Sequence, residues 1–120
     1  MATINRGDVV VARIPQSSSI KLRPYVVIQT DVNNARLTNV ILAMVTTNTK
    51  WVGKVQTQVL VELNAANSAT GLTRDSAIKC ENIFTAPASA VRTIGRLPAG
   101  IMQQVDKALK VSLDLNLFDI

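Results

Sequence analysis

The chain has 120 residues, of which 48% are hydrophobic, and this suits a single domain with its own core. It has no histidine and only one cysteine, which excludes an internal disulfide and leaves no imidazole for zinc or iron, so we expect no metal site and no cofactor. Thirteen Lys and Arg against eight Asp and Glu give a net charge of +5, which favours a polyanionic partner such as nucleic acid; a basic surface that only aids solubility is the alternative.

The first half of the chain contains short β-branched runs that are separated by polar breaks. Residues 7–14 predict a first strand, which a proline and a run of serines end. Residues 25–29 and 39–45 predict two further strands. Between them, the polar stretch at residues 31–36 is typical of a turn.

The second half continues this pattern of short strands. Residues 55–63 alternate between two faces and predict a half-buried strand. A polar stretch follows, and then three short strand-like pieces with a turn at Pro87. The pieces are residues 76–80, 83–85 and 92–97. Many short strands joined by turns predict a mainly β domain, either a barrel or a sandwich.

Only the end of the chain changes its period. Pro98 suits a first helical position, and apolar residues at helical spacing predict an amphipathic helix that ends near Asp114. Its apolar face consists of Ile101, Val105, Ala108, Leu109 and Ser112. From Val111 onward the residues also alternate as a strand would. No run of about 18 apolar residues and no secretory signal pattern occurs, so we expect one soluble, cytoplasmic domain over residues 1–120.

Six short motifs occur along the chain in a particular order. They are R-G-D-V-V at residues 6–10, R-P-Y-V-V-I-Q at 23–29, V-T-T-N at 45–48, D-S-A-I-K-C-E at 75–81, I-G-R-L at 94–97 and V-D-K-A-L-K-V-S-L at 105–113. In this order and spacing, the chain resembles the MazF/PemK family of toxin endoribonucleases from about residue 4 to residue 115. The resemblance implies an SH3-like barrel with a C-terminal α-helix, a homodimer, cleavage of single-stranded RNA (mRNA) at short sequence motifs, and neutralisation by a cognate antitoxin.

Cleavage of RNA by its own 2′-hydroxyl requires removal of that proton, stabilisation of charge at phosphorus and protonation of the departing 5′-oxygen. Without histidine, this work falls to Arg, Lys, Thr and a carboxylate. The resemblance places Arg23 and Thr46 at the positions of the family's active-site arginine and threonine. A guanidinium can bind two phosphate oxygens, and a hydroxyl can donate to one. The alternative for Arg23 is a surface arginine entering a strand. Without the resemblance, Thr46 would be interpreted as an ordinary good β-former.

Glu81 is the carboxylate best placed to act as the base. Lys79 and Glu81 flank Cys80, and on a strand both side chains would share a face. The resemblance relates them to a basic-x-acidic pair of some family members, with Lys79 binding substrate; a structural ion pair is the alternative. Cys80 has no base beside it, and we interpret it as a small buried hydrophobic residue.

The other candidates for RNA binding precede or follow the predicted strand ends. They are Lys21, Thr47, Asn48, Lys50 and Trp51. A tryptophan flanked by Lys50 and Lys54 suits the stacking of one base while the lysines contact phosphates. The alternative for Trp51 is an anchor in the core or in a dimer interface. With only 3% aromatic residues, a platform for several stacked bases is not expected.

The chain also departs from the family pattern. The loop at residues 15–22 lacks glycine and carboxylate, and Asn82 and Phe84 stand where the family has Gln and Arg, so a phosphate contact is expected to be missing there. We interpret Arg6 and Asp8 as structural, with Gly7 between them giving backbone freedom. Two other functions stay open: a non-catalytic, gyrase-binding toxin of the CcdB type, and an RNA-binding module with weak or lost cleavage.

Overall fold

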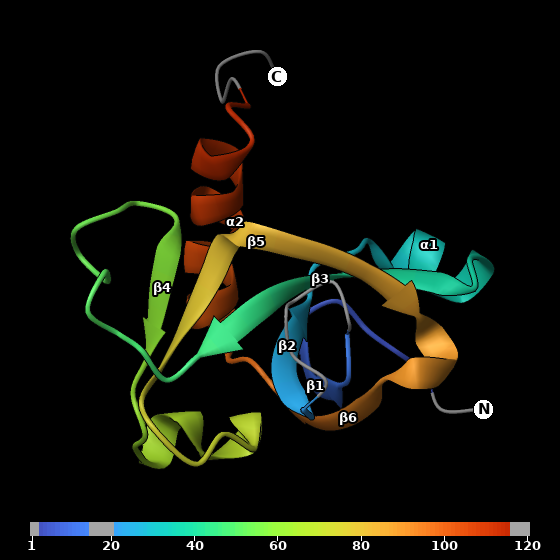
Figure 1. Cartoon of the computed structure of the whole chain (residues 1–120), viewed down its shortest axis with the longest axis horizontal. Coiled ribbons are helices and arrows are strands. Elements are labelled where there is room, and N and C mark those ends of the chain that lie inside the picture. The colour runs from blue at the N-terminus through green and yellow to red at the C-terminus, as the bar shows by residue number, and fades with distance from the viewer. Residues whose placement is uncertain (1–2, 15–20, 116–120) are drawn as a thin grey trace.

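The computed structural model describes residues 3–14 and 21–115. These residues form one antiparallel sheet, flanked by helices, with the strand order β4-β5-β3-β2-β1-β6 (Figure 1). The elements are β1 (Asp8–Ala12), β2 (Arg23–Val27), α1 (Asp31–Arg36), β3 (Asn39–Thr46), β4 (Gln58–Val61), the 3-10 helix η2 (Ala65–Thr70), β5 (Ser76–Pro87), the 3-10 helix η3 (Ala88–Ala90), β6 (Arg92–Arg96) and α2 (Ala99–Ser112). The strongly curled sheet and the C-terminal helix confirm the prediction of a mainly β, SH3-like barrel.

The sheet buries side chains on both of its faces, which explains why its strands are continuous β-branched runs. Neighbouring residues of β1 point to opposite faces, so Val9 belongs to one core cluster and Val10 to the other. The inner cluster, enclosed by the curl, contains the fully buried Tyr25 and Leu42. The outer cluster is covered by α2, which packs against β4 and β5. Both clusters hold the strand ends that carry the candidate site in fixed positions.

The 3-10 helix η2 packs against the edge strand β6. It follows β4 in the chain and lies against β6, where a Cβ atom at Gly95 would come within 2.3 Å of the Thr70 carbonyl group. Only glycine permits this close backbone approach. The next residue after η2, Gly71, has φ +75, which favours glycine for a second reason. Two glycines therefore allow η2 to pack directly against β6.

The R-G-D segment connects the sheet to both α-helices. The Arg6 guanidinium donates from Nε to the carbonyl oxygen of Ile28 at 2.9 Å and pairs through Nη2 with Asp106 of α2 at 2.8 Å. The Arg6 backbone N–H and the Asn34 amide donate to Asp31, which holds the pKa of that carboxyl below its ordinary value. With Gly7 at φ +92, the structural interpretation of this segment is confirmed.

Asp8 in the same segment pairs with Arg96 on the neighbouring strand β6 at 3.0 Å. Its other oxygen accepts the backbone N–H of Asn5 at 2.9 Å. Asp8 is therefore structural too.

Several sequence-based boundaries were wrong. The expected turn at residues 31–36 is the helix α1, in which Asp31 in the first turn and Arg36 in the last suit the helix dipole. The strand expected over residues 55–63 is restricted to Gln58–Val61. Val55 is 37% exposed because the chain turns before it, and Leu63 is 56% exposed beyond the strand end.

The expected separate strands at residues 76–80 and 83–85 are parts of one strand, β5, of 12 residues. Its pairing with β3 shifts register between Ala43 and Met44, which explains why the alternation of the sequence breaks in the middle. Pro87, expected in a turn, is the last residue of this strand.

At the end of the chain, α2 is amphipathic as predicted, with Val105, Ala108 and Leu109 buried. Pro98 is its N-cap rather than its first helical residue, and the helix ends at Ser112. The strand-like alternation from Val111 does not form a strand within the described residues. Over the same ranges, no helix combines the length and the apolar character needed to cross a membrane. The serine loop after β1 lies largely outside the described residues.

Candidate active site

Arg23 and Thr46 come from adjacent antiparallel strands. Arg23 is the first residue of β2, and Thr46 is the last residue of β3. Tyr25 pairs with Met44 in this ladder, and continuing that register by two residues brings Arg23 opposite Thr46. Because residues two apart on a strand share a face, both side chains lie on the same side of the sheet as Tyr25 and Met44. The two strand ends thus present a guanidinium and a hydroxyl side by side at one end of the sheet, here called the Arg23–Thr46 edge.

The Thr46 hydroxyl is oriented by the chain that follows it. Its oxygen accepts the backbone N–H of Asn48 at 3.1 Å, and Asn48 Oδ1 in turn accepts the backbone N–H of Lys50 at 3.2 Å. A hydroxyl that accepts one hydrogen bond still has its own proton to donate. Thr46 is half-buried, so it is held firmly while remaining accessible to a phosphate oxygen.

Lys79 lies further along the same face. It pairs with Met44 of β3 on one side and with Gln58 of β4 on the other. Because Met44 is two residues from Thr46, Lys79 is on the side of the sheet that carries Thr46. The structure therefore brings one ammonium group alongside the Arg23–Thr46 edge.

Glu81 follows in the part of β5 where the register shifts. Its carboxylate accepts the Thr57 hydroxyl at 3.0 Å and the Gln58 side-chain amide at 2.7 Å. The alternative of a structural ion pair between Lys79 and Glu81 is wrong: within residues 3–14 and 21–115 the ion pairs are Arg6–Asp106 and Arg96–Asp8. Glu81 instead connects β5 to the beginning of β4.

Thr57 and Gln58 are the residues that sequence analysis missed. Gln58 is buried, and its amide reaches a carboxylate 23 positions away in the sequence. The alternation of residues 55–63 showed only that Gln58 lies on the polar face. Nothing local in the sequence indicated this partner.

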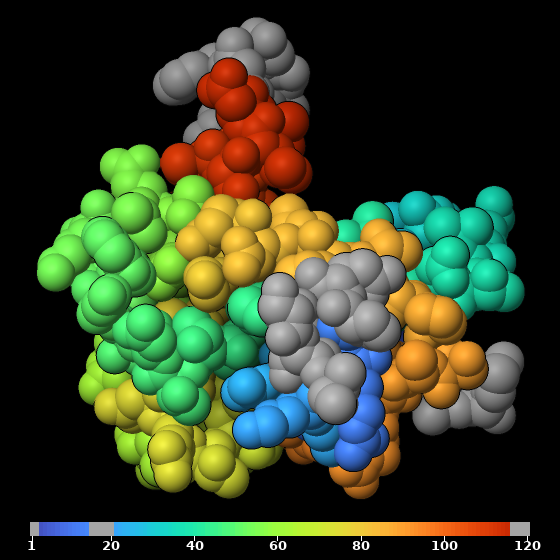
Figure 2. Space-filling view, viewed as in Figure 1, coloured from blue at the N-terminus to red at the C-terminus, as the bar shows by residue number. Residues whose placement is uncertain are grey.

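Trp51 lies in the loop between β3 and β4, and its side chain is 47% exposed. The Nζ atoms of Lys50 and Lys54 are 5.3 and 5.9 Å from the ring centroid. The alternative that Trp51 anchors the core is therefore wrong. Figure 2 shows that this loop (green) and the beginning of β2 (light blue) lie on the same face of the molecule.

The remaining candidates lie on the surface near these strand ends. Lys21 is exposed two residues before Arg23, and Thr47 and Asn48 are exposed directly after Thr46. Phe84, by contrast, packs edge-on against the inner-core ring of Tyr25, with 6.1 Å between centroids. Its ring therefore belongs to the core and not to this edge.

Cys80 is fully buried, and burial, with smaller contributions from the charges of Glu81 and Asp106, raises the pKa of its thiol to about 12. The interpretation of Cys80 as a small buried residue is confirmed. Among the described residues, no group of three or more Cys, Asp and Glu is placed to hold a metal ion.

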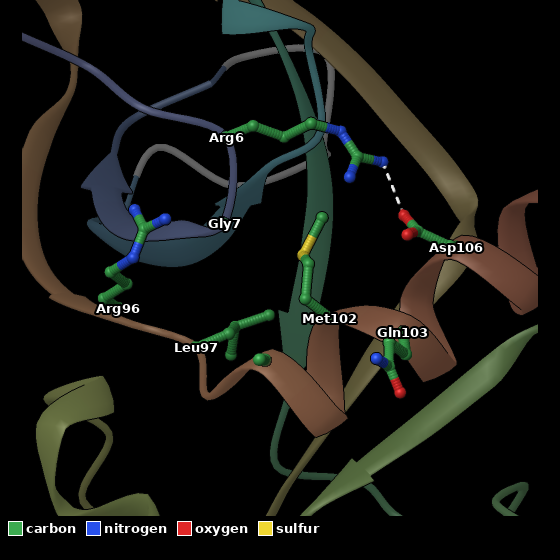
Figure 3. A pocket seen from close by; sticks show the side chains of 8 residues that line it. Arg6, Gly7, Arg96, Leu97, Met102, Gln103 and Asp106 are labelled. Atoms are coloured by element: carbon green, nitrogen blue, oxygen red, sulfur yellow. Dashed lines mark ion pairs between the residues drawn. The ribbon is translucent and has the colours of Figure 1, made fainter.

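A pocket of about 320 Å³ lies elsewhere, where β6 leads into α2 (Figure 3). Its walls include Arg6, Arg96, Met102 and Gln103, and the Arg6–Asp106 ion pair crosses it. None of the predicted site residues lines this pocket. Its two arginines already bind carboxylates, so we regard it as part of the connection between sheet and helix.

Fold and site together define a small SH3-like barrel domain with cationic and hydroxyl side chains at adjacent strand ends. A family model described as "PemK-like, MazF-like toxin of type II toxin-antitoxin system" matches residues 5–113. The chain belongs to this family.

Relatives and solved structures agree with this assignment. Endoribonuclease MazF6 of Mycobacterium tuberculosis is 35% identical over 117 residues, which cover 93% of this chain and 98% of the relative. Endoribonuclease MazF of Staphylococcus epidermidis is also 35% identical, over 97% of this chain and 96% of its own. The structure of Mycobacterium tuberculosis toxin MazF-mt6 is similar with a TM-score of 0.73 and 28% identity, covering 91% of this chain and 98% of the other. A MazE–MazF structure from Deinococcus radiodurans has a TM-score of 0.74 at 14% identity, which supports the fold alone.

Proposed function

We propose that this protein is the toxin of a type II toxin–antitoxin system and that it cuts single-stranded RNA, mRNA in particular, at short sequence motifs without a metal ion. The observation that carries the proposal is the placement of Arg23 and Thr46 on one side of the sheet at adjacent strand ends, with Lys79 alongside. Family membership and relatives named endoribonuclease support the same activity.

In this mechanism, the 2′-oxygen of a ribose attacks the neighbouring phosphorus. The new P–O2′ bond gives a 2′,3′-cyclic phosphate, and the P–O5′ bond breaks. The 2′-hydroxyl proton leaves to a base, and the departing 5′-oxygen takes up a proton to become a hydroxyl. Arg23 binds two non-bridging oxygens, and Thr46 donates to one of them, so fixed donors face the charge that develops in the transition state.

Glu81 is the candidate base of this reaction. Glu81 is exposed, so a substrate can reach its carboxylate, but two protein donors already bind it. A 2′-hydroxyl must therefore replace or share one of these hydrogen bonds. Substrate binding falls to Lys21, Thr47, Asn48, Lys50, Trp51 and Lys79, all of which lie on or next to the ends of β2, β3 and the adjoining part of β5.

For partners, we propose a homodimer and a cognate antitoxin protein. A mycobacterial endoribonuclease with this fold is described in complex with its cognate antitoxin. Cleavage of mRNA would stop translation and growth, and an antitoxin that covers the cationic edge would prevent this.

The test is incubation of the purified protein with a long single-stranded RNA in EDTA, followed by sequencing of the fragment ends. We expect 5′-hydroxyl and cyclic-phosphate ends at a short recurrent motif, and no cleavage by Arg23→Ala or Thr46→Ala protein that retains its far-UV circular dichroism. Binding of RNA without fragments would show an RNA-binding module instead. A protein that neither binds nor cleaves the RNA would refute the proposal.

A further inference from the structure

The loop of residues 47–57, here called the Trp51 loop, exposes the only tryptophan of the chain between two ammonium groups. Almost half of the indole is in contact with solvent. An exposed indole ring offers a flat apolar surface on which a ligand or a partner can pack.

The backbone of the Trp51 loop is already in a fixed conformation. The Trp51 carbonyl oxygen accepts the N–H groups of Lys54 at 3.0 Å and Val55 at 3.1 Å, and Val52 donates to Thr49 at 3.1 Å. Gly53 makes the turn possible with φ +82. The ring and both lysines are therefore presented by a preorganised turn, which reduces the entropy lost when a ligand binds.

The loop is also connected directly to the candidate active site. It begins after Thr46, whose hydroxyl accepts the N–H of Asn48. Trp51 follows Thr46 by five positions, which is at most about 18 Å of extended chain. A strand of RNA with its scissile phosphate at Thr46 would thus reach the indole within a few nucleotides.

The charges around the ring favour a nucleotide over a protein as the occupant. An apolar plate flanked by two ammonium groups matches a base flanked by two phosphates. A protein partner that covered the indole would have to remove water from both lysines, and lysine is depleted in the cores of protein interfaces.

We propose that Trp51, Lys50 and Lys54 form a subsite for one unpaired nucleotide of the RNA, whose base stacks on the indole while its flanking phosphates contact the two ammonium groups. The inference rests on the proposed function and deepens it. Stacking tolerates any base but requires one that is free of a base pair, so the subsite selects single-stranded RNA and not a sequence. Sequence preference must come from other contacts.

Because the chain has one tryptophan, its fluorescence reports on this subsite directly. A single-stranded DNA oligonucleotide lacks the 2′-hydroxyl and cannot be cut, so it serves as the binding probe. We expect it to quench the fluorescence of the native protein and of the control variant Lys107→Ala alike, and we expect the same sequence within a duplex not to do so.

Variants test each part of the subsite. Trp51→Ala should weaken the binding of single-stranded RNA by about 5- to 150-fold, and Trp51→Phe by much less, because a ring remains. Lys50→Ala and Lys54→Ala should each reduce the slope of log affinity against log salt by about 0.7. Lys107→Ala, on the exposed face of α2, is the matched control and should leave that slope unchanged.

The outcomes separate the subsite from the proposed function. Quenching without RNA cleavage supports the subsite and refutes the nuclease. Cleavage by a protein whose fluorescence does not respond to bound oligonucleotide overturns the subsite and leaves the nuclease standing. If Trp51→Ala protein has a smaller molecular mass in solution than the native protein but the same affinity for RNA, the indole belongs to an interface between protein subunits. This outcome also overturns the proposal.

Discussion

Replacement of Thr46 by valine removes one hydroxyl and leaves the shape and the β-branch of the side chain unchanged. In the fold, the hydroxyl accepts one hydrogen bond, from Asn48 in an exposed turn. Losing it should cost about 1 kcal/mol of unfolding free energy. Against a typical total of roughly 5–15 kcal/mol, the variant stays almost fully folded at 25 °C. Loss of a donor to the transition state, by contrast, should lower the rate about 10²- to 10³-fold.

The assay is single-turnover cleavage of a short fluorescent RNA with enzyme in excess, beside thermal unfolding followed by circular dichroism. Thr85→Val is the matched control, since Thr85 is an exposed strand threonine of β5 that pairs with Ile41, away from the site. Thr46→Ser should recover most of the rate because it restores the donor. A Thr46→Val rate within twofold of the native rate would remove this hydroxyl from the mechanism.

Three other predictions follow from the structure. Arg23→Lys keeps the charge but loses the planar guanidinium, so single-turnover cleavage should slow by about tenfold or more, while the salt dependence of RNA binding stays the same. A cleavage rate equal to that of the native protein would contradict bidentate binding by Arg23. Gly95→Ala forces a Cβ against the Thr70 carbonyl group and should lower the free energy of unfolding by about 1–3 kcal/mol, whereas Gly100→Ala, in open space on the first turn of α2, should raise the melting temperature. Melting temperatures that change in the same direction in both variants would contradict this account. The thiol pKa of Cys80, raised from 9.0 to about 12, contributes stability below pH 9 that is lost as the pH rises toward 12. Thiol reagents should therefore label Cys80 only in unfolded protein, which mass spectrometry after labelling in buffer and in urea would show.

Local patterns in the sequence were sufficient to predict most of the sheet. The run at residues 39–45 became β3 almost to the residue, because both faces of that strand are buried and nearly every position is apolar. The amphipathic period of α2 likewise identified its buried face. These signals depend on short-range spacing, which a single sequence displays.

The failures are elements whose cause lies in distant parts of the chain. Helix α1 has no buried residue, so no apolar period indicated it. Gly95 reads as an ordinary residue of a strand until η2 is placed against it. For the site, the sequence supplied Arg23 and Thr46 only through the resemblance, and the register between β2 and β3 then brought them to one edge. No local pattern encodes that pairing.

The contacts of Glu81 relate the shape of the sheet to the chemistry proposed for it. Where β5 shifts register against β3, its residues lose their regular partners, and a charged side chain there would otherwise be free to move. Thr57 and Gln58 hold the Glu81 carboxylate on the β4 side, while Lys79, paired with both neighbouring strands, remains in the regular ladder. The Glu81 carboxylate is thus bound to Thr57 and Gln58 and forms no ion pair with Lys79, two residues away. In the proposed function, the positive charge of Lys79 therefore stays available to a phosphate of the RNA.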